Sequence, residues 1–203
     1  MSASSPSRAT ELAFALAAIL AVSALSAFSP FAIVANAAAA TTAAAAMSPV
    51  LPDAVRAIAP QLEAQGEGNQ RWFGLLVYRA RLWSMRGGWK PAGPFALEIR
   101  YAHSLRGADI AKRSIDEMQH IGVSDSPMLQ RWQSAMQKLF PDVRDGDVLI
   151  GLATAEGQSR FFLNGEPIGQ IDDPGFTAAF FGIWLSPKTS APGLRRELLG
   201  VAQ

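Results

Sequence analysis

The segment from Trp72 to Trp83 constrains the fold more than any other part of the chain. Its residues alternate in the manner of a β-strand, and both of the resulting faces are mostly apolar. A strand of this kind lies inside a sheet that is covered on both sides. The segment 95–101 alternates in the same way, and a loop with several Gly and Pro, residues 86–94, separates the two. We therefore predict two neighbouring antiparallel strands.

The remaining periodicity predicts further helices and strands. Apolar residues recur at helical spacing in the segments 53–65, 106–121, 125–140, 173–186 and 192–199. Strand patterns occupy 147–155, 160–163 and 168–171, and the last two are joined by Asn164-Gly165, a pair suited to a tight hairpin. Because strands come early and late and helices come in blocks, we predict an α+β domain, an antiparallel or mixed sheet with helices layered on it.

The N-terminus is typical of an export signal. An apolar run from Leu12 to Phe28 follows Arg8 and is shorter than the ~20 residues that span a membrane. Ala35-Asn36-Ala37 then supplies the small residues that a signal peptidase reads. We predict a signal peptide over residues 1–37, a low-complexity linker over 38–51 and the folded domain over 52–203. The predicted location is periplasmic or otherwise exported, and an uncleaved membrane anchor is the alternative.

Composition argues against several classes of function. The chain has 18 Lys and Arg against 17 Asp and Glu and no basic cluster, which argues against nucleic acid as a partner. Without Cys it can form no disulfide, thiolate metal site or catalytic thiol. His103 and His120 have no partner at metal-ligand spacing, and motifs for phosphate binding or a serine nucleophile are missing. We therefore expect no metal and no cofactor.

Arg79 and Arg81 are the unusual charges, because they share a strand face with Trp83. One interpretation is a structural ion pair with Glu98 on the next strand. The other is that one guanidinium faces a cleft between the sheet and the helices and binds a carboxylate or phenolate. We expect one arginine of each kind, with Arg79 the structural one because it lies nearer the strand centre. The five Trp and 11 Phe fit either a dense core or an aromatic pocket.

Several fragments, taken in order, resemble the bacterial branch of the chalcone isomerase-like family. They are residues 77–83 (VYRARLW), 140–147 (FPDVRDGD), 162–165 (FLNG) and 176–187 (FTAAFFGIWLSP), and the likeness runs from about residue 62 to 200. The resemblance implies an open-faced β-sandwich, in which helices pack against a large antiparallel sheet. Plant members close a flavanone ring with an Arg for the anion, a Tyr and an Asn on a helix, and two Thr.

The family's catalytic residues have few counterparts in this chain. The strand Thr falls on Val77, and the helix expected to bring Tyr and Asn, residues 108–114, contains neither. Thr177 falls near the second Thr. Arg71 is nearest to the anion-binding Arg but is one residue out of register, and Arg79 or Arg81 could substitute. The resemblance also includes relatives that bind fatty acids without catalysis.

Three hypotheses follow. The leading one is an exported, non-catalytic domain that binds a small amphipathic anion such as a fatty acid; its candidate ligand-binding residues are Arg71, Arg79, Arg81, Trp83 and Thr177. The second is an isomerase, an intramolecular lyase acting on a phenolic enone. The third is a structural or interaction module of the cell envelope. In all three we expect membrane contact only through the N-terminal segment, if that segment is uncleaved.

Overall fold

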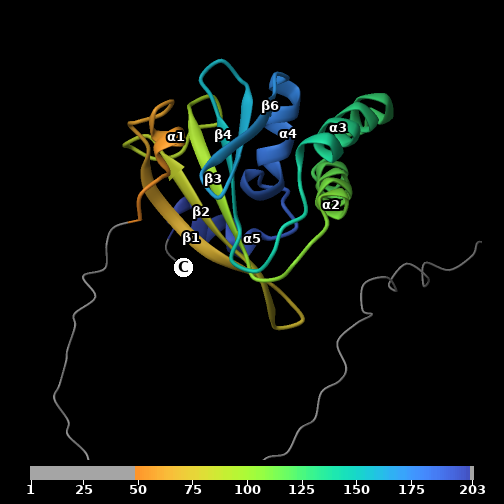
Figure 1. Ribbon diagram of the computed structural model, residues 1–203, viewed down its shortest axis with the longest axis horizontal. Coiled ribbons are helices and arrows are strands. Elements are labelled where there is room, and N and C mark those ends of the chain that lie inside the picture. Colours follow the sequence, from red (N-terminus) through yellow and green to blue (C-terminus); the bar gives the residue numbers. More distant parts are fainter. Residues whose placement is uncertain (1–48, 202–203) are drawn as a thin grey trace, which may run out of the picture. The chain divides into compact units, whose positions relative to one another are not determined.

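The computed structural model describes residues 49–201, in which six strands form one antiparallel sheet. The strands are β1 (Glu63–Trp72), β2 (Leu75–Ser84), β3 (Phe95–Tyr101), β4 (Val148–Ala153), β5 (Ser159–Leu163) and β6 (Glu166–Ile171). Each strand pairs with its neighbour in sequence (Figure 1). This confirms the predicted α+β fold and the antiparallel pairing of the first two predicted strands. The predicted signal peptide and most of the predicted linker lie outside the described residues.

Most helices cover one face of the sheet. Helices α2 (Gly107–His120) and α3 (Ser126–Leu139) are inserted between β3 and β4, and α4 (Pro174–Leu185) and α5 (Pro192–Leu199) follow β6. Their apolar side chains and those of the sheet form the main core. We call this side of the sheet the helix face. In the part of the chain that the structure describes, no helix is long and apolar enough to cross a bilayer.

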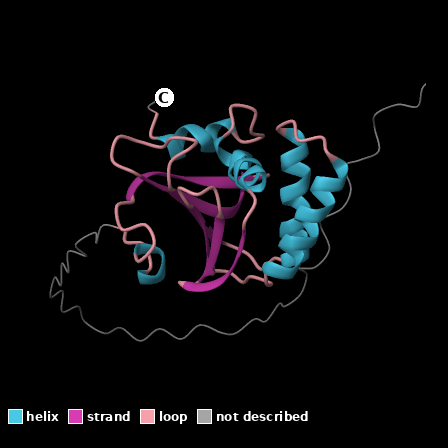
Figure 2. Cartoon of the chain, turned by 90° about the horizontal axis from the view of Figure 1, so that it is seen from above, coloured by secondary structure: helices cyan, strands magenta, loops and turns pink. Residues whose placement is uncertain are grey.

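The opposite side, which we call the open face, has a smaller apolar cluster. The four-residue helix α1 (Asp53–Arg56) lies there, apart from the other helices (Figure 2). Val55 and Leu51 pack there against sheet residues such as Trp83 and Ile150. This cluster covers only part of the open face, because Arg79 and Arg100 on the same side are exposed.

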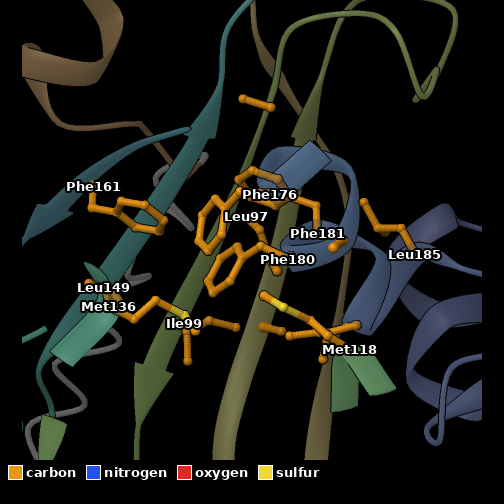
Figure 3. Packing of buried hydrophobic residues seen from close by; sticks show 14 of the residues in the cluster. Leu97, Ile99, Met118, Met136, Leu149, Phe161, Phe176, Phe180, Phe181 and Leu185 are labelled. Carbon is orange, nitrogen blue, oxygen red and sulfur yellow. The ribbon is translucent and has the colours of Figure 1, made fainter. Parts of the chain in front are cut away.

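Aromatic rings fill the space between the sheet and the helices. Phe161 of β5 makes edge-to-face contacts with Phe140, Phe176 and Phe180, and Phe176 stacks on Phe180 with ring centroids 5.4 Å apart (Figure 3). Fully buried Phe side chains of this kind supply much of the hydrophobic stabilisation. Of the two interpretations of the aromatic residues, the structure shows the dense core.

The predicted helix over 53–65 is wrong in its second half. Only Asp53–Arg56 is helical, and Glu63–Trp72 is the edge strand β1. Gly66 of β1 lets the backbone of α5 approach the strand, since a Cβ on Gly66 would lie 2.3 Å from the carbonyl oxygen of Glu197. The predicted strand Trp72–Trp83 begins too early, because Trp72 ends β1, the chain turns at Phe73-Gly74 and β2 begins at Leu75.

Candidate functional site

A group of charged side chains occupies the open face where β1, β2 and β3 lie side by side. Arg81 pairs in register with Glu67 of β1 and Glu98 of β3. Its Nε donates a hydrogen bond to Oε2 of Glu67 over 3.1 Å, and its Nη1 lies 3.9 Å from Oε1 of Glu98. Arg81 is therefore held between two carboxylates.

Trp83 completes this arrangement. Its indole N–H donates to Oε2 of Glu98 over 3.1 Å, and the guanidinium carbon of Arg81 lies 5.7 Å from the centre of its ring. Trp83 itself is buried beneath the charges. The cluster has the hydrogen bonds that a half-buried ion pair requires, and its role is structural.

Arg79 has a different environment. Its register partner on β3 is Arg100, so two guanidinium-bearing residues stand directly opposite one another on one sheet face. Both are exposed, and within residues 49–201 neither has a carboxylate within 4 Å. The single hydrogen bond described for either side chain runs from Nη1 of Arg100 to the carbonyl oxygen of Gly146, 3.3 Å away. Like charges in this position repel and destabilise the sheet.

A groove of about 460 Å³ contains both arginines. It is lined by Glu67, Gly68, Asn69, Arg79, Ala80, Arg81, Glu98, Arg100 and Glu197. Because Arg81 is engaged by Glu67 and Glu98, Arg79 and Arg100 are the groove cations that remain available to an anion. Asn69, the register partner of Arg79 on β1, adds an exposed amide.

Two details of the sequence interpretation need correction. The arginines lie on the open face rather than on the face that carries the main core, and the groove that they line includes a helix only through Glu197 of α5. The expectation that Arg79 makes the structural ion pair is also wrong, because Arg81 makes the ion pairs and Arg79 makes none among the described residues. Strand alternation identifies which residues share a face, but it does not say which face the helices cover.

The other two candidates lie apart from this groove. Arg71 is exposed near the end of β1 and donates through Nη1 to the carbonyl oxygen of Gly74, 3.0 Å away, so it belongs to the β1–β2 turn. Thr177 is buried in the first turns of α4. Its hydroxyl lies 2.7 Å from the hydroxyl of Ser159 and 2.8 Å from the carbonyl oxygen of Gly157. These contacts tie α4 to the sheet.

A polar cluster on the helix face was missed by sequence reasoning. The indole of Trp184 donates to the Tyr78 hydroxyl oxygen over 2.9 Å, and burial raises the pKa of Tyr78 to about 12. Nearby, the buried Glu117 accepts from Arg113 and from the Ser190 hydroxyl. Tyr78 and Trp184 are 106 positions apart, and no local pattern predicts such a contact.

Neither histidine lies in a metal site. His103 and His120 are exposed, and residues 49–201 contain no group of three or more His, Asp or Glu arranged to hold a metal ion. The described side chains therefore offer chemistry through arginine, carboxylate and aromatic groups.

The antiparallel sheet with one helix-covered face is the fold expected of the chalcone isomerase-like class, and residues 50–200 match the family described as chalcone isomerase-like. The chain belongs to this family. It is 30% identical over 136 residues to an uncharacterized protein of Haemophilus influenzae, and the match covers 66% of each chain. It is also similar to the crystal structure of an Arabidopsis thaliana fatty-acid binding protein, with a TM-score of 0.52 and 11% identity, covering 68% of this chain and 87% of that one. This second likeness establishes the fold.

Proposed function

We propose that the domain binds a small amphipathic anion without transforming it, and that the anionic group lies between Arg79 and Arg100. The observation that carries this proposal is the pair itself. Two arginines face each other across neighbouring strands with no carboxylate within 4 Å among the described residues. A carboxylate between them would accept charge-assisted hydrogen bonds from both and would remove their mutual repulsion.

The apolar part of such a ligand has a surface beside the arginines. Val148 of β4 is the register partner of Arg100, is half-buried and packs against the apolar cluster of the open face. A short hydrocarbon body can therefore lie along the sheet while its carboxylate stays at the guanidinium groups. The fatty-acid binding protein of the same fold supports this ligand class.

The structure gives less support to an intramolecular lyase. Ring closure requires positioned groups that transfer protons. The Thr177 hydroxyl is engaged with Ser159 and with backbone carbonyls, and Tyr78 accepts from Trp184 on the face opposite the arginines. A single bound substrate cannot reach the arginine pair and these hydroxyls together, because the sheet separates them.

The proposal includes export, with residues 1–37 as the signal peptide. Sequencing the N-terminus of the native protein tests this part. A mature chain that begins at Ala38 is the expected result, whereas an intact Met1 on protein found in the cytoplasm would contradict export.

Titration with dodecanoate tests the binding site. Arg79→Gln removes one guanidinium from the groove, and Arg86→Gln is the matched control because it removes an equal charge from a side chain that pairs with Glu63 outside the groove. A charge-assisted hydrogen bond contributes ~1.5 kcal/mol or more, so Arg79→Gln should weaken binding about tenfold. Arg86→Gln should bind like the wild type. Equal losses in both variants, or no binding by the wild-type protein, would refute the site.

A further inference from the structure

The tip of the β1–β2 hairpin exposes apolar side chains. Trp72 is 52% exposed, Phe73 86% and Leu75 62%. The rings of Trp72 and Phe73 are in contact, with centroids 5.1 Å apart. Figure 1 shows this hairpin extending beyond the rest of the sheet, at the bottom of the view. Contiguous exposed apolar groups of this kind mark an interaction site.

The conformation of the turn shows that the fold does not require Phe73. Phe73 and Gly74 have φ angles of 47° and 83°, both in the left-handed region, where a bulky residue is strained. The turn between β5 and β6 uses the same conformation at Asn164 and Gly165, with φ of 52° and 91°, and there the sequence has the favoured Asn-Gly pair. Phe73 therefore occupies a position where Asn would stabilise the hairpin, and its ring gains little burial in return.

The charges around the tip favour an anionic surface. The segment 69–80 contains Arg71 and Arg79 and no Asp or Glu. Arg100, which faces Arg79 across β2 and β3, adds a third exposed guanidinium. Leu75 and Arg79 are four residues apart along a strand, which is roughly 13 Å. Apolar groups at the tip and arginines at this distance match the hydrocarbon edge and the phosphate layer of a lipid leaflet.

We infer that the β1–β2 hairpin docks the domain on an anionic lipid bilayer, with Trp72, Phe73 and Leu75 inserted and Arg79 and Arg100 at the phosphates. Aromatic side chains are favoured at this depth. A narrow, protruding tip enters a fluid surface, whereas a protein partner of useful affinity needs a broader complementary face. This contact differs from the expected one through the N-terminal segment. The apolar tip residues carry this inference, and the contact shares Arg79 and Arg100 with the proposed ligand site.

Vesicle binding by a chain that begins at Ala38, the predicted mature N-terminus, tests the inference without the predicted signal peptide. The key variant is Phe73→Asn, and the matched control is Val50→Asn, because Val50 is exposed to 61% but lies far along the chain from the hairpin. We expect the wild-type domain to co-float with vesicles of phosphatidylcholine and phosphatidylglycerol. Phe73→Asn should bind at least tenfold more weakly while melting at the same or a higher temperature, and Val50→Asn should bind normally.

Two further measurements make the result specific. Lipids brominated near the top of the acyl chains should quench Trp72, and Trp72→Phe should remove most of that quenching. Trp72 is the exposed tryptophan of the described residues, whereas Trp83 and Trp132 are buried and Trp89 and Trp184 are half-buried. Dodecanoate affinity should be unchanged in Phe73→Asn, which separates this proposal from the ligand site. Vesicle binding that survives Phe73→Asn would overturn the inference. Concentration-dependent dimers that this variant abolishes, in a protein that does not bind vesicles, would also overturn it.

Discussion

Replacing Arg81 by Met is the sharpest test of how the open face is built. Arg81 is hydrogen-bonded to Glu67, lies near Glu98 and covers the ring of Trp83. The side chains of Arg81 and Glu98 are only 27% and 12% exposed, whereas that of Glu67 is 67% exposed. The Met side chain keeps most of the apolar stem but removes the charge.

The expected loss of stability can be assembled from these contacts. The pair with the exposed Glu67 contributes at most about 0.5 kcal/mol, because solvent screens it. The contact with the Trp83 ring contributes roughly 0.5 kcal/mol. The largest part comes from Glu98, whose carboxylate keeps the Trp83 indole but loses its cation, at a cost of about 1 kcal/mol or more. The total is about 2 kcal/mol, which lowers the melting temperature of a domain of this size by roughly 4–8 °C.

Thermal and urea unfolding of Arg81→Met and Arg79→Met should give opposite results. Arg79→Met removes one of two facing like charges, so it should leave stability unchanged or raise it by about 0.5 kcal/mol. Adding Glu98→Gln to Arg81→Met should recover part of the loss, since the uncompensated charge disappears. A stable Arg81→Met beside a destabilised Arg79→Met would show that the ion-pair assignment is wrong.

Two further predictions concern the helix face. Burial raises the pKa of Tyr78 to about 12 and raises that of Tyr101 further, whereas unfolded tyrosines ionise near pH 10. As the pH rises, the tyrosines of the unfolded state therefore lose their protons first, and the free energy of unfolding falls above about pH 10. Absorbance at 295 nm should show little tyrosinate at pH 11 until the protein unfolds. Tyrosinate in the folded protein at pH 10 would contradict the burial of these two side chains. Gly66→Ala should destabilise the domain by about 2 kcal/mol or more in urea unfolding, because the new Cβ meets the α5 backbone. Gly193→Ala is the control and should not destabilise the domain, because a Cβ there meets nothing within 4 Å. Equal stability of the two variants would refute the close approach of α5 to β1.

Periodicity predicted most of the sheet and the helices because their side chains meet water on one side and the core on the other. The predicted helix over 125–140 is confirmed as α3, and Asp125 caps its start by accepting a hydrogen bond from the Met128 amide. The hairpin at Asn164-Gly165 was likewise predicted from turn chemistry. Local signals of this kind depend only on neighbouring residues.

The edge strand β1 could not be predicted in the same way. Its sequence, EAQGEGNQRW, lacks β-branched residues, and its pairing with β2 is a nonlocal property. Because β1 was not predicted, Glu67 was not recognised as a neighbour of the two arginines. Glu98 was therefore the one carboxylate considered as their ion-pair partner, although Arg81 contacts both. Arg79 was assigned the structural role on its place in the strand, but the positions of the carboxylates decide which arginine is paired.

Both proposals rest on residues that the fold itself does not explain. The helix face is filled by Phe161, Phe176 and their neighbours, and Tyr78 and Glu117 are hydrogen-bonded there, so packing accounts for these residues. On β1 and β2, by contrast, the facing pair Arg79 and Arg100 and the strained, exposed Phe73 both lower stability. Destabilising features of this kind are retained where they serve binding. Both of them lie on the β1–β2 hairpin and on β3, the strand next to it. Phe73→Asn should therefore weaken the interaction with a bilayer and leave that with a carboxylate intact, whereas Arg79→Gln should weaken both, and neither change should lower stability.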